Sequence, residues 1–548
     1  MAHTIHCNQT AAVMMHNYLV ELRSMDANEI LSYIAEIGEP HPEDLFYPPE
    51  GKNEFTSTEL IYEGDDHYKQ GEWRMALEKY NYSILNSLHP VVNDRSVYQD
   101  GNERDKFDFP TTDPAQYGGV DKKQCRALPV AFARRSAILF DAKQYIKCLE
   151  DIDLALEYDY PEKMHYVLDQ RKCKCIARMQ DKFSSTLWHF DLFYEKISLP
   201  YDTDIITPPK DSYDLRALRN LFAQKPKRRK PLLRKANPNI PSLSSAVKVI
   251  GTIPESRRVI ATRNILPVLQ IYCHKKTSTK CVTDSIGTLN ILLGEVLGVE
   301  RAYACSILSL DKMVCSTCLN ETMTPLPCPG CPEVMFCSKT CRARGLAEDH
   351  WLECKLFTSV EEEEHTSLLL AFKMLKNFVN WQYEELFRDM MVDFCMRTEQ
   401  TLGFNKYGLY KSTSFLSLYY LHHDRKPWTM STLFYNCLSS YRVAMMLDLS
   451  GRYYINRSGE TFRPGGQQLF RTSMFILNNI SKEMSNALPC GDRKIKCRGI
   501  FPAISLFNNS VNPSAIYTYS GRVGKVHSLV PIAAGQEITL SIANRPHK

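Results

Sequence analysis

CSTCLNETMTPLPCPGCPEVMFCSKTCRARGLAEDHWLEC, residues 315–354, gathers seven of the chain's 19 cysteines and one histidine. The spacing is C-x2-C-x9-C-x2-C-x5-C-x3-C-x8-H-x3-C, and each C-x2-C pair can turn two thiolates toward one ion. Four thiolate or imidazole ligands close a tetrahedral zinc site that leaves no position for a catalytic water. Structural cysteines buried as small hydrophobes would not show these spacings. The stretch therefore predicts two structural zinc sites, with the ligands Cys315, Cys318, Cys328, Cys331, Cys337, Cys341, His350 and Cys354.

Length and composition describe an ordinary globular protein of several domains. A chain of 548 residues is too long for one core, and it predicts roughly three or four domains. The net charge of +5 gives no argument for a nucleic-acid or membrane partner. We find no apolar run of about 18 residues and no secretion signal in the opening MAHTIHCNQT, so we expect no membrane span and a location in nucleus and cytoplasm. In a reducing compartment the remaining cysteines are expected to be buried thiols rather than disulfides.

Helical hairpins are predicted in the range 57–200. Small residues at Gly64 and Gly71 allow two helices to approach, and Trp73 and Tyr80 fill the groove between them. The pattern resumes in AFARRSAILFDAKQYIKCLEDIDLAL, and a third helical stretch follows at about 162–179. This spacing resembles tetratricopeptide repeats. The alternative is a plain helical domain that binds no ligand.

A basic, proline-rich linker is predicted at 201–245. Its KPKRRKPLLRK stretch, from Lys225 to Lys235, fits either a nuclear localisation signal or an acidic-partner patch, and it fits a solvated linker equally well. Beyond it, RRVIATRNI at Arg257–Ile265 alternates apolar and polar residues as a strand does, and so does KVHSLVPIAAGQEITLSI near the end. The stretch from Leu356 to Ile480 has mostly helical periodicity.

The ligand order, with Phe336 before Cys337 and the short HWLEC ending, resembles a MYND finger. The resemblance implies interleaved sites: one of Cys315, Cys318, Cys337 and Cys341, the other of Cys328, Cys331, His350 and Cys354. Some MYND fingers bind proline-rich peptides through a glutamine and a tryptophan near the last ligands. This chain departs from that pattern, because Arg342 follows Cys341 and Trp351 lies between the final two ligands.

The whole arrangement resembles the SET and MYND domain-containing (SMYD) protein-lysine methyltransferases, and most of all their fourth subfamily, which has N-terminal repeats. RGIFPAISLFNNSVNPSAIYTYSGRVGKVHSLVPIAAGQEI carries most of the likeness. The expected fold is α+β and multidomain, with a helical repeat array and a β-rich SET domain split by a MYND finger and a helical insert. The implied boundaries are a first SET part at 246–314, the finger at 315–354, the insert at 355–487 and a second SET part at 488–548.

The resemblance implies S-adenosylmethionine as a cofactor and assigns residues to it. Cofactor-binding positions are Arg257, Asn486, Asn508 and Asn509, and Tyr519 matches a catalytic tyrosine of the lysine channel. The cofactor motif of the family reads asparagine-histidine-serine-cysteine, one variable residue, proline-asparagine, whereas this chain has NNSVNPS from Asn508. The chain also has Ser256 before Arg257, where the family has a glycine.

Further departures concern the end of the chain and one internal stretch. Ile542 stands where the family has a tyrosine near the transferred methyl group, and the chain ends at Lys548, before the family's post-SET segment. Residues 266–291 have the character of an insertion or a gene-model artefact.

Two functions remain open from the sequence. One is an active protein-lysine methyltransferase, and the other is a catalytically impaired scaffold that binds protein partners through its repeats and finger. A DNA-binding regulator is disfavoured, because the finger lacks a long basic recognition helix.

Overall fold

The computed structural model divides the chain into two compact units, which we call the sheet unit and the finger unit. The sheet unit comprises residues 1–47, 230–311 and 359–548, and the finger unit comprises residues 48–229 and 312–358. The structure describes residues 26–36, 51–90, 125–180, 213–223, 233, 235–251, 256–265, 294–307, 313–350, 353–354, 362–375, 402–405, 407–422, 428–449, 453–454, 462, 465–491 and 497–541.

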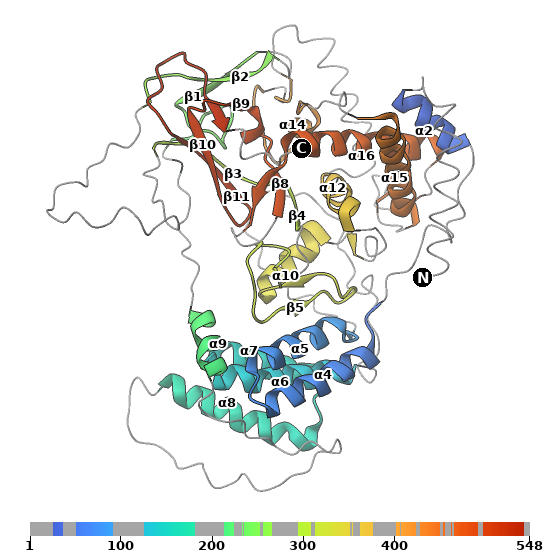
Figure 1. Cartoon of the computed structure of the whole chain (residues 1–548), viewed down its shortest axis with the longest axis vertical. Helices are drawn as coiled ribbons and strands as arrows, with labels where there is room; N and C mark the ends of the chain where they lie inside the picture. Colours follow the sequence, from blue (N-terminus) through green and yellow to red (C-terminus); the bar gives the residue numbers. More distant parts are fainter. Residues whose placement is uncertain are drawn as a thin grey trace, which may run out of the picture. The chain divides into compact units, whose positions relative to one another are not determined.

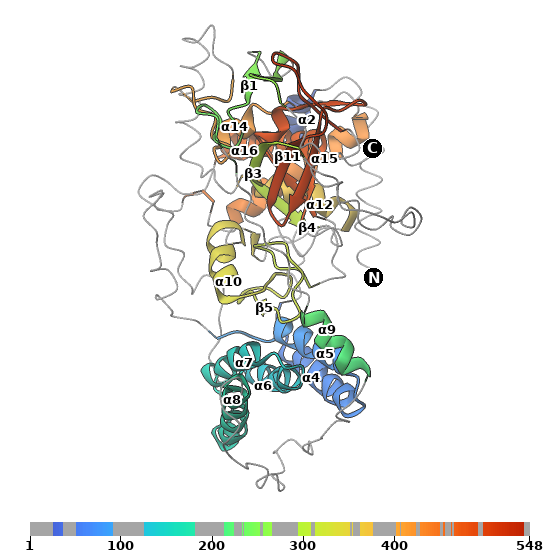
Figure 2. The same cartoon turned by 90° about the vertical axis from the view of Figure 1, so that its left-hand side faces the viewer.

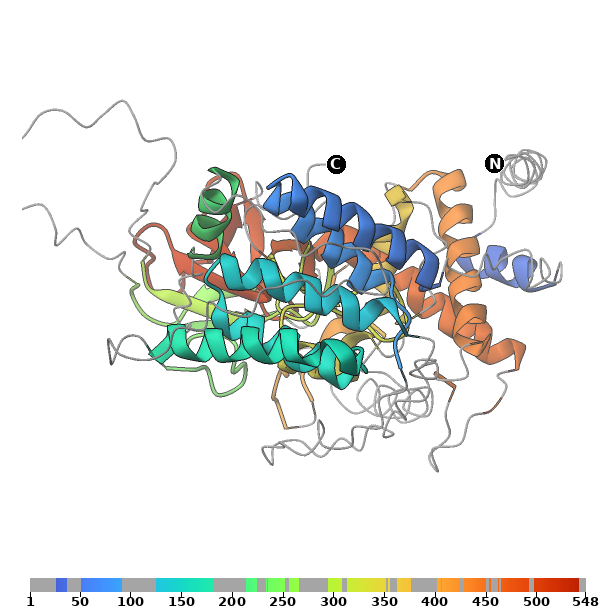
Figure 3. The same ribbon diagram turned by 90° about the horizontal axis from the view of Figure 1, so that it is seen from below.

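The helical part of the finger unit is a series of packed helices, drawn from blue to green in Figure 1 and seen from below in Figure 3. Consecutive helices pack on one another. A Cβ atom at Gly64 would lie only 2.5 Å from the Tyr80 ring, so glycine is what lets the first two helices approach so closely. The helices are α4 (Glu54–Lys69), α5 (Trp73–Asn86), α6 (Ala127–Asp141), α7 (Tyr145–Glu157), the short 3-10 helix η5 (Glu162–Met164) and α8 (His165–Gln180). They occupy the range in which repeats were predicted, and the repeat assignment itself stays a prediction.

The prediction of a linker at 201–245 needs a correction, because part of that range is a helix of the finger unit. Helix α9 (Tyr213–Ala223) buries Leu215 and Leu218 against Trp73 and Leu77 of α5. Two leucines three residues apart form an apolar stripe on one helix face, and that stripe is buried here. The basic stretch 225–235 lies outside the described residues, apart from Leu233 and Lys235.

The finger itself is small and is held by short elements. Strands β5 (Leu326–Pro327) and β6 (Met335–Phe336) pair antiparallel. They lead to α10 (Lys339–Gly345) and to the π-helical turn η7 (Leu346–His350). Ser338 caps α10, since its hydroxyl oxygen accepts a hydrogen bond from the amide of Cys341. Figure 2 shows α10 and β5 in yellow.

The sheet unit is built on a five-stranded sheet in the order β3-β11-β10-β12-β9. Strand β12 runs parallel to both of its neighbours, and the other two pairings are antiparallel. The strands are β3 (Val296–Arg301), β11 (Val523–Ser528), β10 (Ala515–Ser520), β12 (Thr539–Ser541) and β9 (Asn508–Ser510).

The sheet unit also contains two smaller sheets and a short 3-10 helix. Strand β4 (Ala304–Ile307) pairs with β8 (Cys497–Ile500), which pairs with β7 (Leu488–Cys490). Strand β1 (Val247–Ile250) pairs with β2 (Arg258–Ala261), and the 3-10 helix η8 (Ile504–Leu506) precedes β9. The strand predicted at Arg257–Ile265 is therefore present but shorter, with Ile265 forming only an isolated bridge to Ile532. The predicted insertion at 266–291 lies outside the described residues.

The helices of the sheet unit come from the N-terminal stretch and from the part of the chain that follows the finger. Helix α2 (Ala27–Glu36) inserts Ile30 and Leu31 between α15 and α16, where they meet Phe434, Cys437 and Leu477. The other helices are α12 (Glu362–Lys373), α14 (Phe415–Tyr419), α15 (Met430–Leu449) and α16 (Gly466–Asn486). The predicted mixture of helix and sheet is confirmed, while the division into two SET parts stays a prediction. Among the described residues, no helix is long and apolar enough to cross a bilayer.

Candidate metal centre and residues assigned to the cofactor

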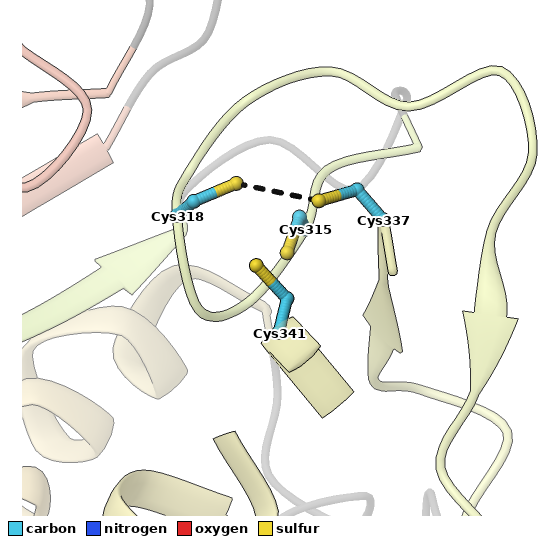
Figure 4. Close-up of side chains that lie close together, drawn as sticks. All are labelled: Cys315, Cys318, Cys337 and Cys341. Atoms are coloured by element: carbon cyan, nitrogen blue, oxygen red, sulfur yellow. Dashed lines mark hydrogen bonds between the residues drawn. The ribbon is translucent and has the colours of Figure 1, made fainter. Parts of the chain in front are cut away.

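The first cluster of the finger contains four cysteines. Their sulfur atoms all lie within 4.8 Å of one another and turn toward a common point in Figure 4. The Sγ atoms of Cys318 and Cys337 are 3.7 Å apart. Two sulfurs that each lie about 2.3 Å from one tetrahedral zinc ion are separated by about 3.8 Å. The cluster of Cys315, Cys318, Cys337 and Cys341 therefore fits a zinc ion.

The second cluster contains three cysteines and a histidine, all of them buried. The Sγ atoms of Cys328 and Cys354 are 3.7 Å apart, and His350 Nε2 lies 3.2 Å from Cys328 Sγ and 3.3 Å from Cys331 Sγ. The ring therefore presents Nε2 to the same point as the sulfurs. This geometry also matches a tetrahedral zinc site.

A carboxylate orients the histidine of the second cluster. Glu353 Oε1 lies 3.1 Å from His350 Nδ1, and both side chains are buried. Zinc-bound histidines commonly donate their other ring N–H to a carboxylate, which fixes the tautomer and the ring orientation. The sequence reasoning missed Glu353, although an acidic residue between the last two ligands is a signal that could have revealed it.

These two groups have the interleaved membership that the MYND resemblance implies. Within the part of the chain that the structure describes, they are the groups of three or more His, Cys, Asp or Glu side chains that could hold a metal ion. The finger therefore carries the donor sets of a zinc-binding module.

The helices of the finger unit hold the finger through buried polar side chains. Asn81 Nδ2 donates to the main-chain carbonyl of Met323 at 3.0 Å, and Arg135 Nη1 donates to that of Pro325 at 2.9 Å. Arg135 is fully buried and bonds Asp151 with two further N–H groups, at 2.7 and 2.8 Å. Because side chains of the helices donate hydrogen bonds to main-chain carbonyls of the finger, the helices and the finger share one buried polar network.

Arg342 makes a second connection between finger and helices. Burial raises the pKa of the Tyr158 hydroxyl, at the end of α7, and the nearby positive charge of Arg342 on α10 partly opposes that rise. That hydroxyl also lies 3.2 Å from His89 Nε2. Burial, aided by nearby Lys52 and Arg342, lowers the pKa of His89 to about 3, so this ring is neutral. Arg342, one of the departures from peptide-binding MYND fingers, thus contacts the helices of its own unit.

In the sheet unit, three of the four residues assigned to the cofactor bind either one short segment of chain or one another. Asn508 Nδ2 donates to the carbonyl of Arg257 at 2.9 Å. Arg257 Nη1 in turn donates to the carbonyl of Tyr420 at 3.2 Å, and Asn486 Nδ2 donates to the carbonyl of His422 at 2.7 Å. Arg257 and Asn486 therefore both bind main-chain carbonyls of residues 420–422, and Asn508 binds the main chain of Arg257.

The remaining predicted site residues lie in the five-stranded sheet or outside the described residues. Asn509 follows Asn508 in β9 and is paired with Leu540 of β12. Tyr519 lies on β10, two strands from β9, and its ring stacks on that of Tyr517 with centroids 5.9 Å apart. Ile542 is not among the described residues.

Comparisons with known proteins agree with the geometry of the finger. The family described as MYND finger matches residues 315–354. The chain is similar to proteins named protein-lysine N-methyltransferase SMYD4. It is 23% identical to the Gallus gallus protein over 75% of this chain and 62% of the relative. It is 22% identical to the Mus musculus protein over 75% and 58%, and 24% identical to the Homo sapiens protein over 42% and 29%.

The match thus spans about three-fifths of the chicken relative and less than a third of the human one. It nevertheless runs along three-quarters of this chain, far beyond the finger. The chain therefore contains a MYND finger and is similar, well beyond that finger, to SMYD4 proteins of the SET and MYND domain-containing (SMYD) family.

Proposed function

We propose that the protein is an S-adenosylmethionine-dependent protein-lysine N-methyltransferase whose reaction centre lies in the sheet unit. The observation that carries this proposal is the contact between Asn508 and Arg257, with Asn486 bonded to the same segment, 420–422. Arg257 lies more than 200 positions before Asn486 and Asn508 in the chain, and all three are residues that the SMYD resemblance assigns to the cofactor. The relatives named protein-lysine N-methyltransferase support the same reaction class.

Transfer of a methyl group from S-adenosylmethionine to lysine depends mainly on alignment of the lysine amine with the methyl group. S-adenosylmethionine supplies an electrophilic methyl group on its sulfonium. Arg257, Asn486, Asn508 and the backbone of Asn509 would hold the cofactor, and the hydroxyl of Tyr519 would orient the lysine amine. Alignment of two reactants in a closed site supplies a large part of the rate enhancement in such transfers.

We assign both zinc ions a structural role. Four protein ligands close each site, so neither has room for a substrate or a reactive water. The ligands are those of the two clusters, Cys315, Cys318, Cys337 and Cys341 in the first and Cys328, Cys331, His350 and Cys354 in the second.

The alternative is an impaired relative that acts as a scaffold for protein partners. The observation that favours it is that the Asn508 amide is already engaged, by the Arg257 carbonyl and by Glu537 Oε1 at 2.9 Å. Ile542 in the place of a tyrosine points the same way. Partners would bind the helices and finger of the finger unit, and we propose no direct contact with DNA or membranes. A location in nucleus and cytoplasm stays a prediction.

Calorimetric titration of the zinc-loaded full chain with S-adenosylmethionine tests the proposal. We expect saturable binding that Asn486→Ala weakens at least tenfold and that Asn28→Ala, an exposed change on α2, leaves unchanged. Binding must be accompanied by transfer of labelled methyl groups to proteins of a cell lysate. Binding without transfer would support the scaffold, and absence of binding would reject the methyltransferase.

A further inference from the structure

Glu300 is a buried carboxyl group of the sheet unit. It lies on β3 and is 2% exposed. Its Oε1 accepts a hydrogen bond from the amide of Ala503 at 2.9 Å, and its Oε2 accepts one from the amide of Ile504 at 2.8 Å. Both oxygens are therefore used on consecutive main-chain N–H groups at the start of η8. An acidic side chain that accepts from the first amides of a helix fixes where that helix begins.

Tyr410 also binds this turn. The hydroxyl of this buried tyrosine is 3.1 Å from the carbonyl of Pro502 and 3.3 Å from that of Ser417. The carbonyl of Pro502 and the amides of the next two residues are thus bound by two buried side chains from distant parts of the sequence. Few conformations of this turn satisfy both.

Glu300 lies in register with the proposed catalytic tyrosine. It is paired with Gly524 of β11, and Gly524 is paired with Tyr519 of β10. Residues directly opposite one another in antiparallel strands share a face of the sheet. A Cβ atom at Gly524 would lie 2.7 Å from Tyr517 Cε2 and 3.0 Å from Ile504 Cδ1. Glycine at this position is therefore what allows η8 to lie directly on the face that carries Glu300 and Tyr519.

The turn leads directly into β9, the strand that carries Asn508 and Asn509. Helix η8 ends at Leu506, and after Phe507 the chain enters β9 at Asn508, whose amide binds the Arg257 carbonyl. Only three residues separate Ile504 from Asn508. A displacement of the start of η8 would therefore be transmitted to Asn508 with little slack to absorb it.

We propose that Glu300 is a positioning residue, which ties η8 to the sheet face of Tyr519 and thereby sets the place of Asn508 and β9 relative to that tyrosine. The role of these residues in binding S-adenosylmethionine rests on the proposed function. The tie between Glu300 and η8 does not.

Glu300→Gln tests the tie with little change of volume. Glutamine keeps one acceptor but places an NH2 group against a main-chain N–H, so one hydrogen bond is lost and two donors face each other. Hydrogen-exchange mass spectrometry should show exchange about tenfold faster in residues 501–510, which corresponds to the loss of about 1.4 kcal/mol of local stability. The matched control is Glu295→Gln, close by in sequence, whose carboxylate pairs with Arg263. It should leave exchange in residues 501–510 unchanged.

Two further readouts separate a local tie from general damage and from the proposed function. Zinc content and exchange in α15 should match wild type in Glu300→Gln, while the dissociation constant for S-adenosylmethionine should rise about tenfold. Unchanged exchange in residues 501–510 would overturn the inference. If exchange is faster in Glu300→Gln but the wild-type protein binds no S-adenosylmethionine, the contact between Glu300 and η8 is supported and the proposed function is rejected. If Glu300→Gln fails to fold, Gly524→Ala applies the same test from the sheet side, and normal exchange in residues 501–510 of that variant would overturn the inference.

Discussion

Arg135 and Asp151 form a buried, two-pronged ion pair inside the finger unit, with Nε–Oδ2 and Nη2–Oδ1 distances of 2.7 and 2.8 Å. The pair holds the guanidinium so that Nη1 points at Asn81 Oδ1 and at the carbonyl of Pro325, each 2.9 Å away. One arginine therefore joins α6, α7, α5 and the finger. The folding of the helices and of the metal module should be coupled through it.

Arg135→Met should strongly destabilise the finger unit. The change leaves the carboxylate of Asp151 buried without its cation, and breaking a buried pair from one side costs about 3–5 kcal/mol. Exchange should accelerate both in α6 and α7 and in residues 320–327. In the double variant Arg135→Met/Asp151→Leu, helix protection should largely return while residues 320–327 stay fast, because the bond to Pro325 is still missing. Equal recovery of both regions would contradict a role for Arg135 in holding the finger.

Cys328→Ser should lower the bound zinc from two ions per chain to one. The change removes a thiolate from the second cluster only, and each cluster closes around its own ion. Elemental analysis of purified protein measures the stoichiometry directly. Cys173→Ser, at an exposed cysteine of α8, is the matched control and should retain both ions. Loss of both ions in the control, or retention of both in Cys328→Ser, would refute the assignment.

Glu353→Gln should weaken zinc binding at the second cluster by about 10- to 100-fold, the usual effect of losing a carboxylate partner of a zinc-bound histidine. Competition with a chromophoric chelator gives the affinity of each site. Glu333→Gln changes an exposed glutamate of the same finger and should have no effect. The first cluster should hold its ion equally well in both variants, so a loss there would mean general damage to the finger.

The stability of the sheet unit should fall as the pH rises toward 8. Burial raises the pKa of Glu300 from 4.5 to about 8, against the hydrogen bonds from Ala503, Ile504 and Ser412, which lower it. Between pH 6 and 8 the unfolded chain has therefore lost this proton while the folded chain still keeps it. Stability then decreases with a slope approaching about 1.4 kcal/mol per pH unit and levels off above pH 8. Denaturation monitored by exchange in β3 measures it, and the difference between wild type and Glu300→Gln isolates this carboxyl. A difference that grows above pH 8 would contradict the assignment.

The eight candidate ligands could be predicted from sequence because zinc coordination depends on local spacing. Two C-x2-C pairs and residues one helical turn apart largely determine which atoms can meet. The strand at Arg258–Ala261 could be predicted for a similar reason, since alternation is a local signal. Glu353 was within reach of the same reasoning, because it lies between two predicted ligands.

Other features depend on contacts that no local pattern encodes. Nothing in the sequence around Arg135 distinguishes it from an arginine on the protein surface. It is buried only because α6, α7 and the finger pack together around it. Helix α9 was not predicted within the proline-rich, basic stretch. Its apolar stripe is short, and the residues of α5 that bury it lie about 140 positions earlier in the chain. The meeting of Arg257, Asn486 and Asn508 was expected from family resemblance and not from any periodicity in the chain.

The boundaries of the two units have a practical consequence for deletion experiments. The finger unit is made of two separate lengths of chain, 48–229 and 312–358, and the sheet unit of three. Removing the N-terminal helices would leave the Met323 and Pro325 carbonyls without Asn81 and Arg135. Loss of activity or of a partner after such a truncation would therefore report damage to the metal module as much as absence of the helices. Point substitutions at single buried contacts, rather than shortened chains, are the appropriate tools for dissecting this protein.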